Sequence, residues 1–253
     1  MSEIRISLLH LALEAGDLQG NNELLERGIH TAAAAGSDWV FAPELCWAVD
    51  HGSDIIGTDW IDGQPDKWTT RICELARSLK LMVLFGHAER VEAGKLYNSA
   101  FLVNQEGAVV GRHRKINTHA ETWASSGQSA QPIPWNGIKI GILICADSYT
   151  SESARALRSK GAQMLVSPAA WAPGLYGPEG EWEQRTIETG LPLIVCNRNG
   201  KEATMTFCDA QSLVIKNGKR LLMHSSERSA VMTFQWDLDG MLPTSKQFLI
   251  TYI

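Results

Sequence analysis

The sequence lacks the cysteine and histidine patterns that mark disulfide-rich or metal-binding proteins. Five cysteines occur in 253 residues, an odd number, widely separated and without any Cys-x-x-Cys pair. This arrangement argues against a disulfide framework and against a structural zinc site. The seven histidines have neither His-x-His nor His-x-x-x-His spacing, so they do not predict a zinc centre. We therefore expect reduced thiols and no metal ion.

Long apolar runs and blocks of like charge are also missing. No apolar run approaches the ~18 residues that a membrane span needs, and residues 1–7 lack the basic region and apolar core of an export signal. The 23 basic and 28 acidic residues give a formal net charge of −5, with the basic residues scattered. This balance gives no electrostatic footprint for nucleic acid or for an anionic membrane. We expect a cytoplasmic protein whose partner is a small neutral or polar molecule.

Linker-like segments are absent as well. The chain contains no proline-, serine- or glutamine-rich run and no low-complexity stretch, so residues 1–253 are expected to form a single domain. Hydrophobic residues make up 44% and charged residues 20% of the sequence, which is the composition of an ordinary globular protein. A chain of this size can bury a substantial core and shape a pocket.

Short β-type runs alternate with helical segments, which is the pattern of an α/β protein. The predicted strands cover residues 4–9, 39–41, 81–85, 100–103, 138–144, 164–166, 193–196 and 212–215. The predicted helices cover residues 22–35, 66–79, 151–159 and 179–189, the second with Asp66 as a start signal after Pro65. Residues 100–112 and 212–222 resemble hairpins that turn at 105–107 and 216–218, so we expect mixed sheets and disfavour a plain Rossmann fold.

A weak internal echo relates two segments of the chain. Residues 36–43 match residues 161–168 in type: each follows a helix-like stretch and runs from glycine through a short strand to proline. Many helix-to-strand connections contain such a glycine, so the echo is compatible with a common local geometry. It also predicts two related halves, each with functional groups at the carboxyl end of a strand, Glu44 in one and Trp171 in the other.

Cys145 is the first candidate for chemistry. It directly follows the apolar run 138–144 and precedes a segment that leads into a helix. A thiol near a helix N-terminus is favoured as the nucleophilic thiolate, and a tight turn would expose it and direct the next backbone N–H toward a developing oxyanion. Taken alone, the same position is more typical of a small apolar residue that ends a buried strand.

Two charged residues follow other strands. Glu44 lies among Phe41, Leu45 and Trp47, and an acid placed among such neighbours is a candidate general base, although a salt-bridged loop acid would look similar. Lys115 ends the basic run 112–115, which by itself suggests a solvated face or a phosphate contact. A buried lysine beside a cysteine would instead stabilise a thiolate and a tetrahedral intermediate.

Together these segments resemble the nitrilase, or carbon-nitrogen hydrolase, superfamily, whose members place Glu, Lys and Cys in that order, each after a β-strand. The similarity covers roughly Ile4 to Trp236, and an ordered set of spaced matches is more specific than any one motif. The further matches are Asn98, Arg114, Asp147, Glu152, Arg155, Gly161, Ala162, Pro168, Trp171, Trp182, Arg185, Asn197, Arg198 and Gly200.

The resemblance implies a role for each matching residue. Cys145 is the expected nucleophile and Glu44 the general base, while Lys115 and the backbone N–H of Ala146 are expected to stabilise the oxyanion. Glu121 is the candidate for the family's second glutamate, which orients the lysine. Trp123 and Trp171 are candidates for lining the substrate pocket, although either would equally serve ordinary packing. Neither a metal nor an organic cofactor is required.

The resemblance also implies a fold, an activity and an assembly. The fold would be an αββα sandwich with two mixed β-sheets, and the substrate a small amide: a primary amide, an ω-amide or an N-carbamoyl amine. Nitrile hydrolysis and acyl transfer would use the same residues. A homodimer, or a higher homo-oligomer, would form through the helices after Cys145 and near Trp182.

Departures from the family pattern leave alternatives open. Ala146 replaces the usual aromatic residue, and the segments 184–189 and 209–212 also differ, so the substrate is undetermined. A Cys–His hydrolase would pair Cys145 with His113 or His119. A phosphate-binding module is disfavoured because the chain has no glycine-rich phosphate loop. A catalytically silent interaction protein on the same fold is disfavoured by the retained Glu, Lys and Cys.

Overall fold

Two mixed β-sheets face each other in the computed structural model, which describes residues 3–48, 55–119, 121–174, 177–202 and 205–253. The first sheet contains β1 (Glu3–His10), β2 (Trp39–Phe41), β3 (Met82–Arg90), β4 (Leu96–Val103), β5 (Val109–Arg114), β12 (Ala230–Asp237), β13 (Leu242–Pro243) and β14 (Leu249–Tyr252). The second sheet contains β6 (Ile133–Trp135), β7 (Ile138–Ile142), β8 (Met164–Ala169), β9 (Leu193–Asn197), β10 (Ser212–Lys216) and β11 (Lys219–His224).

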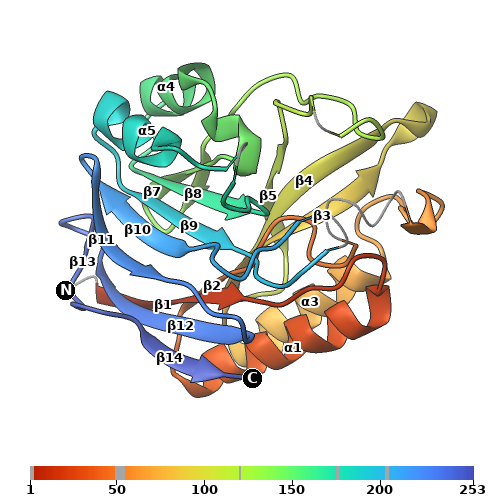
Figure 1. The fold of residues 1–253 in the computed structure, drawn as a ribbon, viewed down its shortest axis with the longest axis horizontal. Helices are drawn as coiled ribbons and strands as arrows, with labels where there is room; N and C mark the ends of the chain where they lie inside the picture. The colour runs from red at the N-terminus through yellow and green to blue at the C-terminus, as the bar shows by residue number, and fades with distance from the viewer. Residues whose placement is uncertain (1–2, 49–54, 120, 175–176, 203–204) are drawn as a thin grey trace.

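Helices cover the outer face of each sheet. The first sheet is covered by α1 (Leu18–Ala34) and α3 (Lys67–Leu79), and the second by α4 (Ser151–Ser159) and α5 (Glu181–Thr189). Figure 1 shows the four layers, with α4 and α5 at the top and α1 and α3 at the bottom. Two short 3₁₀ turns, η1 (Glu92–Gly94) and η2 (Cys145–Ser148), complete the elements. The expected αββα sandwich is confirmed.

Both sheets combine parallel and antiparallel pairs, as the hairpins predicted. The first has the order β13-β12-β1-β2-β3-β4-β5, with β14 also paired to β12, and the second has the order β11-β10-β9-β8-β7-β6. Strands β1, β2 and β3 run parallel, as do β7, β8 and β9, whereas the β4–β5 and β10–β11 hairpins are antiparallel. The parallel strands carry their carboxyl ends to the same region between the sheets.

The core explains why the central strands have no polar alternation. In β2, Trp39 and Phe41 join the cluster between the two sheets, whereas Val40 packs toward α1 and α3. Strand β3 repeats the pattern, with Met82 and Leu84 on one face and Val83 and Phe85 on the other. Strands buried on both faces read as continuous apolar runs. Burial on two sides therefore produces the unbroken hydrophobic segments seen in the sequence.

The internal echo corresponds to two similar units of strand, helix and parallel strand. In one unit α1 ends at Ala34, Gly36 turns with φ 74°, and β2 pairs in parallel with β1. In the other, α4 ends at Ser159, Gly161 turns with φ 88°, and β8 pairs in parallel with β7. Positive φ at both turns favours glycine.

Within the described residues, no helix combines the length and the apolarity required to cross a membrane. All five cysteines are free thiols. Asp17 caps the N-terminus of α1 by accepting the N–H of Gly20, and Asp66 caps α3 by accepting the N–H of Thr69. The Asp66 start signal is therefore confirmed, whereas α1 begins one turn earlier than predicted.

Candidate active site

Glu44 lies in the turn that follows β2, and its side chain is completely buried. Asn98 Nδ2 donates to Glu44 Oε1 at 2.8 Å, and Lys115 Nζ donates to the same oxygen at 2.6 Å. The backbone N–H of Ala170 donates to the other oxygen, Oε2, at 3.1 Å. A buried carboxylate is stable only when its oxygens are paired in this way. Glu44 therefore occupies a built polar site rather than a solvated loop.

Lys115 follows β5 and places its ammonium between two carboxylates. Its Nζ contacts both Glu44 and Glu121, and only 4% of the residue is exposed. The backbone N–H of Lys115 donates to the carbonyl of Asn98 at 2.8 Å, which extends the β4–β5 pairing past the end of the strand. The side chains of the basic run 112–115 therefore have different partners. Arg112 and Arg114 bind Glu89, whereas Lys115 binds the buried carboxylates.

Glu121 and Asn98 complete this cluster. Asn98 Nδ2 also donates to Glu121 Oε2 at 3.1 Å, so one amide group bridges both carboxylates. Burial raises the pKa of Glu121, Glu44 raises it further, and the charge of Lys115 opposes both effects. Two carboxylates that share one buried ammonium favour a state in which one carboxyl group holds a proton. The arrangement suits a group that must accept and return a proton.

Cys145 begins η2, three residues after Ile142, the last residue of β7. Its φ of 42° lies in the left-handed region, so the chain turns sharply at the nucleophile candidate. A non-glycine residue is held there only when its surroundings compensate for the strain. The residue is buried, with 6% exposed, whereas the sequence had predicted an exposed thiol; the cause is the apolar core that surrounds the end of β7.

Asp147 fastens the Cys145 turn to the Lys115 segment. Its Oδ1 accepts the backbone N–H groups of Ile116 and Asn117 at 2.8 and 2.9 Å, and its Oδ2 accepts from His113 Nε2 at 2.8 Å. Oδ2 also accepts the N–H of Ile144 at 3.0 Å. Burial alone raises the pKa of Asp147, but the hydrogen bonds and charge of His113 and the backbone N–H groups leave it below its ordinary value.

This contact fixes the spacing of the two candidates. The donors to Asp147 lie on both sides of Lys115 in the chain, and Asp147 is two residues beyond Cys145. The amide of Asn117 also donates to the carbonyl of Ala146 at 3.0 Å. The turn after β5 and the turn after β7 are therefore held together by several hydrogen bonds. Lys115 and Cys145 therefore lie on segments that are hydrogen-bonded to each other.

Aromatic side chains surround the second half of this region. The ring of Trp171 lies 4.7 Å from that of Tyr149 and 5.0 Å from that of Trp182. The backbone of Trp171 is fixed by Asn197, whose amide accepts its N–H and donates to its carbonyl. A cavity of about 200 Å³ adjoins Trp171 and Trp182. Trp123 instead packs against a separate apolar cluster of Leu45, Ile61 and Ala88. Leu45 is the residue that follows Glu44 in the chain.

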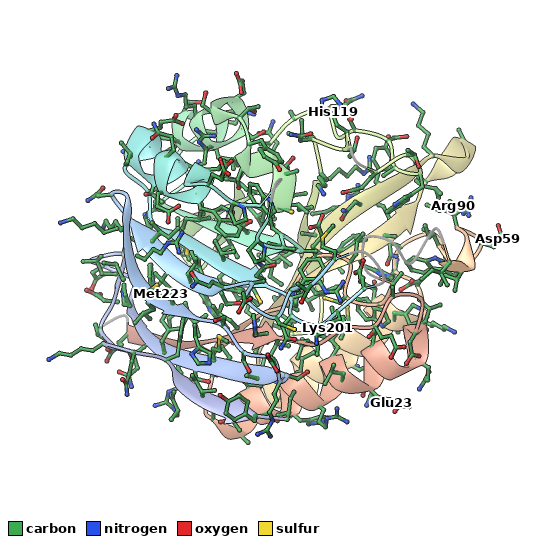
Figure 2. All side chains as sticks on the ribbon, viewed as in Figure 1. Glu23, Asp59, Arg90, His119, Lys201 and Met223 are labelled. Atoms are coloured by element: carbon green, nitrogen blue, oxygen red, sulfur yellow. The ribbon has the colours of Figure 1, made fainter. Side chains whose placement is uncertain are left out.

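The two histidine candidates differ from the position that a Cys–His hydrolase requires. His113 is buried, and its Nε2 is bound to Asp147. His119 is exposed at the margin of the molecule, on the loop that follows β5 (Figure 2). Glu44, Lys115, Glu121 and Asn98 contact one another directly, so the geometry favours a carboxylate and lysine site around Cys145. Among the described residues, no cluster of His, Cys, Asp and Glu could hold a metal ion.

Sequence reasoning missed several supporting residues. Asn98 was matched to the resembling family, but its bridge between two carboxylates was not predicted. The Asp147 contact with His113 and the Asn197 contact with Trp171 were missed as well. The sequence did contain a signal for Asn98, because a polar side chain in an apolar strand is expected to need a buried hydrogen-bond partner. The identity of that partner depends on tertiary contacts.

Comparison with known proteins gives matches at the level of the family and of the fold. A family model described as carbon-nitrogen hydrolase matches residues 5–244. The omega-amidase of Mus musculus is 28% identical over 197 residues, covering 72% of this chain and 68% of the relative. An (R)-stereoselective amidase of Pseudomonas sp. is 26% identical over 256 residues, covering 97% of this chain and 89% of the relative.

A solved structure shows the same fold. The amidase from Nesterenkonia sp. AN1, in a mutant form in complex with acrylamide, superposes with a TM-score of 0.83 at 21% identity. The match covers 94% of this chain and 92% of that chain. The layered arrangement of two mixed sheets is therefore shared along most of both chains.

Proposed function

The chain belongs to the carbon-nitrogen hydrolase family, and on that premise we propose that it hydrolyses a C–N bond of small amides through Cys145. The observation that carries the proposal is the buried cluster of Glu44, Lys115, Glu121 and Asn98, held beside the Cys145 turn by Asp147. The burial of charged groups costs free energy. Clusters of this kind are therefore typical of functional sites.

The first half of the proposed reaction forms a thioester. Glu44 takes the proton of the Cys145 thiol, and the thiolate adds to the amide carbonyl. The ammonium of Lys115 and the N–H of Ala146 stabilise the negative oxygen of the tetrahedral intermediate. Glu44 then returns the proton to the nitrogen, the C–N bond breaks, and ammonia or an amine leaves. Glu121 and Asn98 hold Lys115 and Glu44 in position.

The second half releases the acid. Water occupies the place of the departed amine and gives a proton to Glu44 as its oxygen adds to the thioester carbonyl. The C–S bond breaks, Cys145 recovers its proton from Glu44, and the carboxylic acid leaves. One water is consumed for each amide, and the residues return to their initial state. None of these steps requires a metal or an organic cofactor.

The substrate class follows from the relatives and from the site. The proposed substrates are a primary amide, an ω-amide or an N-carbamoyl amine. Relatives named as omega-amidase and as (R)-stereoselective amidase support an amide. Structures of the Nesterenkonia amidase hold acrylamide or butyramide, which are small primary amides. We propose a primary amide with an acyl group of a few carbons as the first compound to test.

Replacement of Cys145 tests the proposed function. Purified protein is incubated with primary amides, ω-amides and N-carbamoyl compounds while released ammonia is measured. We expect Cys145→Ala to lower kcat by at least about 10³-fold, because no other group can form the thioester. Cys73→Ala is the matched control, since Cys73 is a free, half-buried thiol on α3, and it should retain wild-type activity.

Mass spectrometry adds a second measurement. Wild-type protein mixed briefly with a slow amide should gain the mass of one acyl group, and the Cys145→Ala protein should gain none. Full ammonia release by the Cys145→Ala variant would show that another group performs the chemistry.

We also propose that two copies associate through α4 and α5. Ile187 on α5 is 58% exposed, and an isoleucine so exposed on a short helix is suited to a contact between copies. Light scattering of the purified protein should give twice the chain mass of 27.8 kDa. Ile187→Asp should return the mass to that of one chain, and a dimer that survives this change would require a different interface.

A further inference from the structure

Three aromatic residues form one wall beside the catalytic cluster. Tyr149, Trp171 and Trp182 are in sequential ring contact, the first pair tilted by 60° and the second nearly perpendicular at 82°. Trp171 and Trp182 are buried, whereas Tyr149 is 42% exposed. We call these residues the aromatic wall. Such rings present a flat apolar surface with little conformational freedom to lose on binding.

The wall is attached directly to the reacting groups. Tyr149 follows the single turn that begins at Cys145, and its N–H donates to the carbonyl of Ala146 at 3.1 Å. Burial raises the pKa of the Tyr149 hydroxyl, and Tyr149 is also close enough to Cys145 for a negative charge on the thiol to raise that pKa further. Trp171 directly follows Ala170, whose N–H binds the carboxylate of Glu44. The rings of Tyr149 and Trp171 therefore lie near Cys145 and Glu44, where the acyl group of a bound amide would be placed.

Three described cations near the wall each contact an anion. Arg220, which lines the cavity beside Trp171 and Trp182, binds the carboxylate of Glu183. Lys115 contacts the carboxylates of both Glu44 and Glu121. Arg185, on α5, donates to the carbonyl of Ser148 at 2.8 Å and to the carboxylate of Glu188 at 3.0 Å. An ω-carboxylate on the substrate would need an arginine or lysine to offset its loss of water. Because these cations already have partners, they are poorly placed to bind an ω-carboxylate.

A carboxylate stands on the same side as the wall. Glu181 lies in the first turn of α5 and directly precedes Trp182, and its carboxylate accepts the N–H of Glu179. The pKa of Tyr149 is raised by burial first, and then by the negative charges of the Cys145 thiolate and of Glu181. The Tyr149 hydroxyl is therefore close enough to both groups to sense their charge. The ω-carboxylate of a substrate bound at this wall would be repelled by the carboxylate of Glu181.

We propose that the aromatic wall binds the acyl group of the substrate and that Glu181 excludes acyl groups bearing a carboxylate. The enzyme would thus select amides with a neutral or cationic acyl group, such as alkyl and aryl amides, over ω-amides of dicarboxylic acids. The proposal rests on the proposed amide hydrolysis and narrows its substrate class. Tyr149 and Glu181 then act as specificity-determining residues, while Cys145, Glu44 and Lys115 perform the chemistry.

Three amides of matched length test the selection. Hexanamide, the monoamide of adipic acid and 6-aminohexanamide differ only in a terminal group that is neutral, anionic or cationic. We expect the kcat/KM for hexanamide to exceed that for the adipic monoamide by about tenfold or more, with 6-aminohexanamide closer to hexanamide. Ammonia release by wild-type protein gives the three values.

Two variants separate the charge of Glu181 from the net charge of the protein. Glu181→Gln should raise the ratio of kcat/KM for the adipic monoamide to that for hexanamide by about threefold or more. Glu23→Gln is the matched control, because Glu23 is an exposed carboxylate on α1, the helix that covers the other sheet. This control should leave the ratio unchanged. An equal change of the ratio in both variants would show a nonspecific effect of net charge and overturn the role of Glu181.

Two variants of Tyr149 separate the ring from its hydroxyl. Tyr149→Ala should raise the KM for hexanamide by about tenfold with a smaller effect on kcat, because it removes the apolar contact. Tyr149→Phe should recover most of that loss. If Tyr149→Ala lowered kcat alone, the ring would not be a binding surface.

The outcomes distinguish this inference from the proposed function. Equal or better hydrolysis of the adipic monoamide by the wild-type protein would overturn the selection and leave amide hydrolysis intact. Failure to hydrolyse any amide, with no acyl group bound to Cys145, would contradict the proposed function and the inference with it.

Discussion

Lys115 is surrounded by more negative charge than one ammonium can balance. Both Glu44 and Glu121 contact it, and Asn98 donates to each carboxylate. Removal of one partner from a buried group of charges costs more than the contact itself, because the remaining charge stays buried. The raised pKa of Glu121 fits this balance, since a proton on one carboxyl group reduces the repulsion between the two. The Glu121 carboxyl group therefore takes up a proton more readily than an ordinary glutamate does.

A buried histidine outside the site predicts how stability changes with pH. His10 is completely buried, and its pKa is lowered from 6.5 to about 4 by burial first and then by the charge of His224. The folded protein favours neutral His10, so this stabilisation is complete above pH 6.5 and is lost as pH falls toward 4. The loss amounts to about 3 kcal/mol.

Urea unfolding between pH 7 and pH 4 measures this effect. His10→Asn keeps a polar group near the Nδ1 position, which binds the carbonyl of Asn197, but it cannot titrate. We expect a lower stability at pH 7 and a flatter dependence on pH than in the wild type. His30→Asn, on the exposed face of α1, should keep the wild-type slope. A His10→Asn slope as steep as that of the wild type would show that other groups cause the dependence.

The site residues that the sequence predicted share one property. Glu44, Lys115 and Cys145 each follow a β-type run, so their positions at strand ends could be inferred from local pattern and from family resemblance. The roles of Asp147 and Asn197 could not, because each binds a backbone or side chain far away in the sequence. The burial of Cys145 also depends on distant elements that close over the end of β7.

At the scale of elements, strand β3 supports the turn that carries Glu44. A Cβ added at Gly86 would lie 2.6 Å from both the Cα of Glu44 and the backbone nitrogen of Leu45. Real Cβ atoms do not approach backbone so closely, so Gly86→Ala must displace the turn. We expect kcat/KM to fall by about 10- to 100-fold and the free energy of unfolding by about 1–3 kcal/mol.

Gly63→Ala is the control for this change. A Cβ at Gly63 would meet only the carbonyl of Arg90 at 3.8 Å, which is an ordinary contact. Ammonia release and urea unfolding should both remain near wild type in this variant. If Gly86→Ala kept full activity, the turn would tolerate displacement and Glu44 would not need its present position.

Most elements were predicted, and some of the failures have physical causes. The strands at 39–41 and the helix at 151–159 were predicted with correct bounds. Strand β12 was missed although residues 233–237 alternate between polar and apolar side chains, and the two-residue β13 is too short to produce a pattern. The predicted strand 138–144 ends at Ile142, since the sharp turn at Cys145 interrupts it. Tertiary contacts decided each of these boundaries.

At the scale of the molecule, the site exists only where two sheets meet. Asn98 lies in β4 of the first sheet, and Glu44 and Lys115 follow strands of that sheet, whereas Cys145 and Ala170 follow strands of the second. Two sets of hydrogen bonds cross between them, from Ala170 to Glu44 and from the segment around Lys115 to Asp147. The distance between Cys145 and Glu44 is therefore set by the packing of the two sheets against each other.

Asp147→Asn tests this coupling. The amide would face N–H donors with its own N–H group, so the free energy of unfolding should fall by about 2–4 kcal/mol and kcat/KM by about 10- to 100-fold. Because the folded protein holds the pKa of Asp147 low, the contribution is complete above the ordinary Asp pKa of about 3.9. It is lost as pH falls through the folded-state pKa, and the variant and wild type then converge.

Urea unfolding across pH and ammonia release measure these changes. Asp38→Asn is the control, since Asp38 is exposed and also accepts a backbone N–H, from Arg5. It should alter activity less than twofold. If Asp147→Asn lost stability without activity, the contact would support the fold but would not set the geometry of the site.

The pairing of β1 with β12 has a consequence for synthesis on the ribosome. The two strands pair along their full length, from Glu3 with Asp237 to His10 with Ala230, although residues 11–229 separate them in the chain. At the usual speed of translation, the first strand waits on the order of 10–40 s for this neighbour. During that time the apolar side chains of Ile6 and Leu8 lack part of their cover. The nascent chain therefore leaves one edge of β1 without its neighbour until β12 has emerged, and the first sheet is completed only near the end of translation.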